Sequence, residues 1–155
     1  MIAVVQRVYS ATVYADGERS GSIERGLYIL LGVEATDDTT DADLLIEKLH
    51  KLRIFSDENG KMNLSADDIG AEAMLVSNFT LCANYVHGNR PDYLSAAKPK
   101  EASFLYDYAL QRATTCFKKV ASGRFGADMR TDMSTDGPVT IVLESEKLRK
   151  KPRQK

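Results

Sequence analysis

The sequence contains few of the residues that carry most enzyme chemistry. Among its 155 residues are two cysteines, Cys82 and Cys116, and two histidines, His50 and His87. Two cysteines without metal-ligand spacing exclude a disulfide-stapled scaffold and a cysteine metal centre, and they indicate a reducing, cytoplasmic compartment. No zinc-protease, P-loop or serine-hydrolase signature occurs. We therefore expect no metal and no cofactor, and a catalytic triad would lack its usual members.

Long apolar runs are also missing. The longest lies at residues 27–33 and is broken by Gly32. It is far shorter than the roughly 20 residues that a membrane-spanning helix needs. Arg7 interrupts the apolar N-terminal stretch early, which is unlike a secretory signal. We expect a protein with no membrane association.

Charge is nearly balanced overall, but it is unevenly distributed. The net charge is −1, which argues against a dedicated nucleic-acid-binding protein. Residues 147–155 hold six basic residues and no acidic one, so the rest of the chain carries 15 basic and 22 acidic residues, a net −7. We predict one domain over residues 1–146 and a basic, disordered tail over 147–155. The tail is either merely solvated, a contact for a polyanion, or a nuclear address.

Periodicity predicts an α+β fold with a mainly antiparallel sheet. Asp16-Gly17 predicts a hairpin turn, and the polar residues 82–98 predict a long loop. Two helices are expected, one capped within residues 37–40 and reaching about Leu52, and one running over residues 100–120 with Cys116 on its buried face. The expected strands are residues 2–8, 11–15, 27–33, 73–79, 127–134 and 138–144.

Gly137-Pro138 lies inside an otherwise strand-like run, where proline cannot donate to a ladder. One interpretation is an ordinary turn before an edge strand. The other is a rigid dipeptide with two carbonyl oxygens turned the same way, which could bind an amine or test the handedness of a substrate.

Six segments in the same order resemble the D-aminoacyl-tRNA deacylase family, formerly called D-tyrosyl-tRNA deacylases. The resemblance covers residues 1–143 and rests on Met1–Val8, Arg53–Asp57, Gly60–Asn63, Ser77–Leu81 with Gly88–Asp92, Gly123–Met129 and Thr135–Thr140. The chain departs from the family's pattern twice. Asn78 replaces the usual glutamine, and Thr135 replaces the usual asparagine.

The resemblance implies a barrel-like sheet flanked by two helices and assembled as a homodimer. It implies a cis Gly137-Pro138 peptide that enters the active site of the opposing subunit and rejects L-amino acids. Thr80 would be catalytic with Ser77, Asn78 and the backbone of Phe79. Other residues expected to contact the substrate or RNA are Phe125, Met129, Arg90 and Thr135.

The residues themselves leave several roles open. Thr80 is a nucleophile, a hydrogen-bonding group or a strand-end cap, and no base is in sight to activate it. Phe79 and Phe125 are core residues or walls for the terminal adenine. Arg90 is an ordinary surface arginine or a phosphate ligand. His50 is expected to be structural and His87 to be a solvated loop residue.

The expected function is hydrolysis of the ester in D-aminoacyl-tRNA, and of glycyl-tRNA mischarged on tRNA(Ala), at the tRNA 3′ end. Such an ester is already activated and needs only a placed water and oxyanion donors. Two alternatives remain: a non-catalytic tRNA- or DNA-binding protein, and a paralogue that deacylates a mischarged L-aminoacyl-tRNA.

Overall fold

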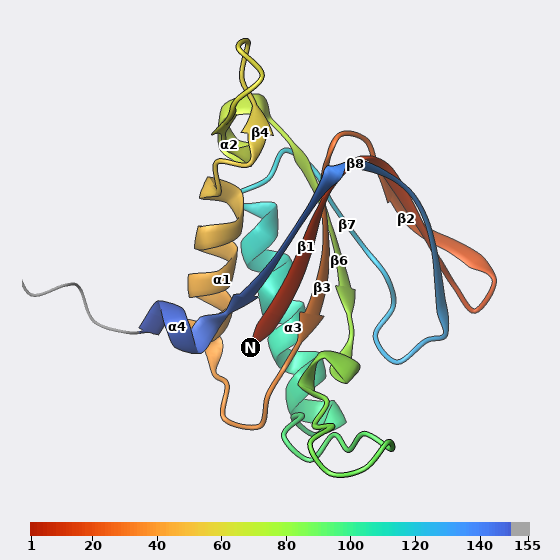
Figure 1. Ribbon diagram of the computed structural model, residues 1–155. Helices are drawn as coiled ribbons and strands as arrows, with labels where there is room; N and C mark the ends of the chain where they lie inside the picture. Colours follow the sequence, from red (N-terminus) through yellow and green to blue (C-terminus); the bar gives the residue numbers. More distant parts are fainter. Residues whose placement is uncertain (150–155) are drawn as a thin grey trace, which may run out of the picture.

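The computed structural model describes residues 1–149 and shows one strongly curved sheet with helices against one face (Figure 1). Strand β1 (Ile2–Ala15) is its centre. Along one edge β1 pairs first with β3 (Gly26–Gly32) and then with β2 (Glu18–Ile23), and along the other edge it pairs with β8 (Met129–Glu144). All three pairings are antiparallel. The parallel strands β6 (Glu72–Ser77) and β7 (Val120–Ser122) continue the sheet beyond β3.

Helices α1 (Thr39–Lys51) and α3 (Pro99–Thr114) lie side by side over the outer face of the sheet (Figure 1). Between them and the sheet lies the larger core, which includes Leu27, Ile29, Leu45 and Leu49. The concave face holds a smaller core around Val8, Val13, Tyr28, Met74 and Val76. The α+β, barrel-like fold with two flanking helices is therefore confirmed.

The remaining elements are short. The two-stranded sheet of β4 (Phe55–Ser56) and β5 (Met62–Leu64) precedes α2 (Ala66–Ile69), the 3-10 helix η1 (Phe79–Cys82) follows β6, and α4 (Ser145–Arg149) follows β8. Asp16 and Gly17 form the predicted hairpin turn, both with positive φ. Residues 147–149 of the predicted tail belong to α4, and residues 150–155 lie outside the described part of the chain. Within residues 1–149 no helix is long and apolar enough to cross a membrane.

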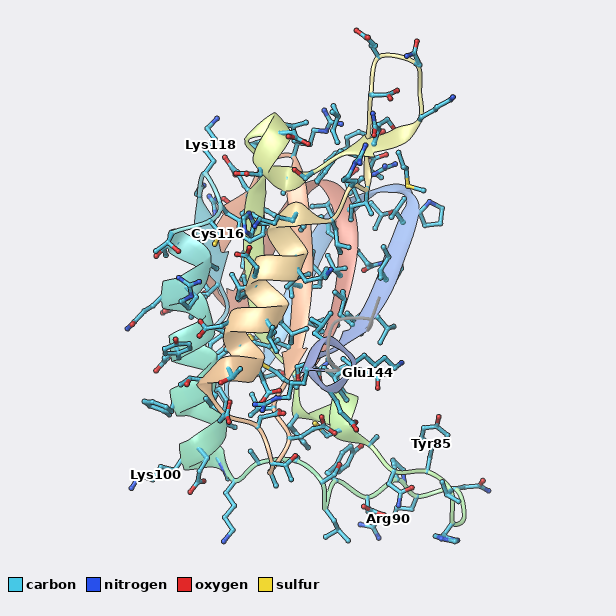
Figure 2. The ribbon with its side chains drawn as sticks, turned by 90° about the vertical axis from the view of Figure 1, so that its left-hand side faces the viewer. Tyr85, Arg90, Lys100, Cys116, Lys118 and Glu144 are labelled. Carbon is cyan, nitrogen blue, oxygen red and sulfur yellow. The ribbon has the colours of Figure 1, made fainter. Side chains whose placement is uncertain are left out.

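The second helix is shorter than predicted. It ends at Thr114, at two consecutive β-branched residues of low helix propensity, whose hydroxyls donate to the carbonyls of Gln111 and Arg112. Phe117 is still buried, so the apolar residues after 114 reach the core through a turn and through β7. Cys116 therefore lies beyond the helix, as Figure 2 shows, and is only partly buried.

Strand boundaries differ from expectation near the two motifs. The strand expected over residues 73–79 stops at Ser77, and the chain then turns into η1. The two expected closing strands are one, β8, in which Thr135–Gly137 is included. Its pairing with β1 shifts register between Gln6 and Ser10, so the dipeptide occupies an irregular stretch rather than a gap between strands.

Candidate active site

The Ser77–Thr80 segment lies where β6 ends. The N–H of Asn78 donates to the carbonyl of Leu31 at 2.9 Å, one step beyond the last strand pair, and η1 begins at the next residue. A Cβ added at Gly32 would lie 2.9 Å from Leu81 Cβ and 3.1 Å from the Asn78 oxygen. Only glycine therefore lets this turn pack so closely against β3.

Thr80 is exposed and its hydroxyl donates to Oδ1 of Asn78 at 2.5 Å. An amide oxygen is not a base that takes a proton at neutral pH. Among residues 1–149 no carboxylate or imidazole bonds to this hydroxyl. The contact thus fits a hydrogen-bonding group better than an activated nucleophile.

The backbone of Phe79 and Thr80 offers hydrogen-bond donors. These residues open η1, and the first N–H groups of a helical turn have no acceptor inside it. The side chain of Asn78 makes no capping bond to them. The result is a pair of N–H groups beside the Thr80 hydroxyl, which is the donor arrangement that an oxyanion needs.

A cavity of about 750 Å³ adjoins this segment. Ser77, Asn78 and Phe79 line it, as do the predicted pocket residues Phe125 and Met129. Aromatic rings also meet in its walls. Phe79 contacts Tyr93 with ring centres 5.1 Å apart, and Tyr106 contacts Phe125 at 6.0 Å. Its other walls are largely apolar, with Leu30, Leu31, Val33, Val76, Ala96, Ala97, Pro99 and Ala102.

Four tyrosine and threonine residues in this cavity escaped the sequence analysis: Tyr28, Tyr93, Tyr106 and Thr131. One of them gave a signal. Tyr28 is the single hydroxyl-bearing residue within the aliphatic run of residues 27–33, and a buried tyrosine in a strand needs a partner for its hydroxyl.

Gly137-Pro138 lies elsewhere on the same chain. Its peptide bond is cis, both residues are exposed, and neither lines the cavity. Gly137 has φ +131°, and a Cβ there would lie 2.6 Å from the nitrogen of Val139. Thr135 is exposed beside them. One chain thus brings Ser77–Phe79, Phe125 and Met129 together and leaves the dipeptide apart from them.

Arg7 holds the residue that precedes the dipeptide in the chain. Its buried guanidinium donates to the carbonyl of Ile54 at 2.6 Å and to the carbonyl and carboxylate of Asp136, at 3.3 and 3.1 Å. The guanidinium thus bonds both the backbone and the side chain of Asp136, the residue that precedes Gly137. Sequence analysis assigned no role to Arg7.

Arg90 and His87 are exposed on the loop between η1 and α3. Figure 2 shows Arg90 and Tyr85 projecting from this loop at one end of the molecule. Backbone bonds between Asn84 and Asp92, 2.8 and 2.9 Å long, close the loop at its base. Arg90 therefore extends from an anchored loop rather than lining the cavity.

His50 is buried in α1 against Phe117, and its Nε2 lies 3.3 Å from Glu47. That position is structural and away from the cavity. Within the described residues no group of three His, Cys, Asp or Glu side chains could hold a metal ion. The expectation of metal-free chemistry stays a prediction.

Comparisons with known proteins agree with the resemblance. The family model described as D-Tyr-tRNA(Tyr) deacylase matches residues 4–144. A D-aminoacyl-tRNA deacylase of Geotalea daltonii is 50% identical over 95% of this chain and 98% of its own, and one of Variovorax paradoxus is 51% identical over 93% and 99%.

Solved structures share the fold. A c-Myc DNA unwinding element binding protein superposes with a TM-score of 0.87 at 37% identity, over 93% of this chain and 98% of its own. A probable eukaryotic D-amino acid tRNA deacylase superposes with a TM-score of 0.78 at 15% identity, over 92% and 97%, a likeness of fold alone. The chain therefore belongs to the D-Tyr-tRNA(Tyr) deacylase family.

Proposed function

We propose that this protein is a hydrolase that cleaves the ester of D-aminoacyl-tRNA and releases the free D-amino acid and the tRNA. Family membership and the names of its relatives support the activity. The observation that carries the mechanism is that Phe79 and Thr80 open a 3-10 helix without a side-chain cap, next to a large cavity that Phe79 lines and Thr80 does not. We also propose that the reaction takes place in the cytoplasm, where tRNA serves in translation.

The proposed mechanism needs little from side chains. The two N–H groups stabilise the oxyanion that forms when water attacks the ester. Thr80 hydrogen-bonds the ester or the water, and Asn78 orients Thr80 through the 2.5 Å contact. Ser77 adds a hydroxyl at the end of the strand. The terminal adenosine enters the cavity between Phe125 and Met129, and Arg90 pairs with a phosphate of the acceptor end.

Selectivity would require a second copy of the chain. In the proposed homodimer, Gly137-Pro138 of one subunit faces Ser77–Thr80 of the other, and its carbonyls crowd the side chain of an L-amino acid. Glycine has no side chain to crowd, so glycyl-tRNA is a second substrate. Support comes from the exposure of the dipeptide and from large exposed apolar side chains on β1 and β8, namely Tyr9, Met133 and Val142.

Deacylation of D-tyrosyl-tRNA, L-tyrosyl-tRNA and glycyl-tRNA(Ala) tests the substrate class. We expect release from the first and third and not from the second. Preferred release from L-tyrosyl-tRNA would contradict the proposal and support the L-specific alternative.

A mixing experiment tests the shared site. A Thr80→Ala chain and a Gly137→Ala chain are each assayed alone and after co-expression. If each site uses Thr80 of one chain and Gly137 of the other, the mixed dimer has one intact site and regains activity or selectivity. If Thr80 and Gly137 of the same chain act in one site, mixing restores neither activity nor selectivity.

A second candidate is a non-catalytic nucleic-acid-binding protein. The solved relative with 37% identity bears the name of a DNA-binding protein, which favours this candidate. Tight, salt-sensitive binding to duplex DNA with no deacylation of any of the three substrates would establish it.

A further inference from the structure

Two hydroxyls meet across the concave face of the sheet, inside the cavity. Tyr28 reaches from β3 and Thr131 from β8, and Oη of Tyr28 lies 2.9 Å from Oγ1 of Thr131. Both residues line the cavity, and Tyr28 is only 5% exposed. The strands on either side supply apolar neighbours such as Val76 and Met129. A polar pair thus lies in an otherwise apolar wall.

The bond between Tyr28 and Thr131 leaves one hydroxyl hydrogen unused. Each hydroxyl carries one hydrogen, and their mutual bond uses only one of the two, whichever group donates. Among residues 1–149, neither hydroxyl has another hydrogen-bond partner. Burial raises the pKa of Tyr28, so it stays protonated. The pair therefore presents one unused donor and several unused lone pairs to the cavity.

A neighbouring tyrosine shows the contrast. Tyr106 also lines the cavity, but its hydroxyl donates to the backbone carbonyl of Leu75 at 2.9 Å. Its hydrogen is committed within the fold. Each hydroxyl of the Tyr28–Thr131 pair has one partner, but the second hydrogen of the pair is not committed within the described residues and is available to a ligand atom in the cavity.

We propose that Tyr28 and Thr131 together bind the edge of the terminal adenine of the tRNA and so set how deeply it enters the cavity. This rests on the proposed function. Adenine presents an amino donor beside a ring-nitrogen acceptor, which matches an adjacent acceptor and donor. Guanine presents two acceptors on its major-groove edge, and the pair has only one hydrogen to give. Phe125 and Met129 contact the faces of the base.

The test compares D-tyrosyl-tRNA ending in adenosine with the same tRNA ending in purine riboside, which lacks the 6-amino group. We expect the native protein to prefer adenosine about tenfold in kcat/KM, the size of one good hydrogen bond. In Tyr28→Phe this preference should fall toward one, through a raised KM for the adenosine substrate at unchanged kcat. Thr131→Val should do the same from the opposite strand, and Thr131→Ser should restore the preference.

Tyr106→Phe is the matched control, because it removes a hydroxyl from the same cavity that is already bonded to backbone. It should lower the melting temperature and leave the adenosine preference intact. A native protein without the preference, or folded Tyr28→Phe and Thr131→Val variants that keep it, would overturn the inference. Absence of any deacylation by the native protein would instead overturn the proposed function.

Discussion

The hydroxyl of Thr80 donates to a neutral amide, which favours a hydrogen-bonding role over a nucleophilic one. We expect Thr80→Ala to slow deacylation by at most about 10²–10³-fold, the loss of one transition-state hydrogen bond. Thr80→Ser, which keeps the hydroxyl, should retain most activity. Single-turnover kinetics measure both. An aminoacyl ester trapped on Thr80 would show that the residue is a nucleophile after all.

We expect Arg7 to affect selectivity through Asp136, the residue before Gly137. Removing the guanidinium in Arg7→Met leaves the Asp136 carboxylate and the Ile54 carbonyl without their donor. Breaking a buried charge pair costs about 3–5 kcal/mol, so the variant should be less stable. In addition, the ratio of kcat/KM for D- and L-tyrosyl-tRNA should fall. The control Arg19→Met, at an exposed hairpin position, should leave that ratio unchanged. An unaltered ratio in a folded Arg7→Met variant would show that Arg7 has no role in selectivity.

Among the elements, α4 is held to α1 by one charge cluster. Arg149 donates to both carboxylate oxygens of Asp41 at 2.8 Å and to Asp38 at 2.6 Å. Burial alone would raise the pKa of Asp41, but the Arg149 guanidinium and the backbone N–H of Asp38 hold it well below its ordinary 3.8. Asp41 also completes the capping box of α1.

Asp41→Asn should therefore destabilise the protein by about 1–3 kcal/mol at neutral pH. Because the folded-state pKa is depressed, the contribution of Asp41 is fully present above about pH 4 and is lost as pH falls through the folded-state value. The difference in melting temperature between native protein and variant should thus shrink in acid. Glu58→Gln, on an exposed turn, should show no such trend. A constant difference down to pH 2 would contradict the assignment.

The same scale shows what sequence can predict about elements. Alternation and turn residues located the core strands and α1, since those signals are local. The end of α3 was missed because Phe117 and Val120 continue the helical spacing although the helix ends at Thr114. The continuity of β8 was missed because β8 pairs with β1 on both sides of the dipeptide, Thr135 with Val8 and Thr140 with Gln6, and no local pattern reports partners so far away in the chain.

On the scale of the whole molecule, the site could be predicted in part. The motif residues Phe125 and Met129 were expected in the pocket and do line it. Tyr28, Tyr106 and Thr131 come from three separate elements, and only the curvature of the sheet and the position of α3 bring them to one cavity. In the proposed homodimer Gly137-Pro138 acts in the site of the other subunit, so folding of a single chain does not bring the dipeptide to the cavity.

The basic C-terminal residues contribute to the charge of the whole molecule. Residues 150–155 hold four of its basic side chains. Deleting them, while keeping α4, should weaken tRNA binding at low salt and flatten the plot of log K against log salt by up to about 3–4. The preference for D over L should not change. Fluorescence anisotropy over a salt series measures this slope. An unaltered slope would show that residues 150–155 do not contribute to tRNA binding.

We expect no metal ion in the mechanism, so chelation should leave the deacylation rate unchanged within about twofold. Loss of a catalytic Lewis acid would instead cost several kcal/mol. A control must show that the tRNA stays folded when magnesium is chelated. Activity that is lost with chelator and restored by one divalent ion acting on the protein would contradict this prediction.

The pairing of β1 with β8 also bears on how the chain is made. Residues 2–15 leave the ribosome long before residues 129–144, the strand that covers one of their edges. Such distant pairing slows folding and leaves an open strand edge exposed meanwhile. Nascent chains stalled with residue 128 as the last to clear the exit tunnel should be digested readily by protease. Chains that have also cleared residue 144 should resist.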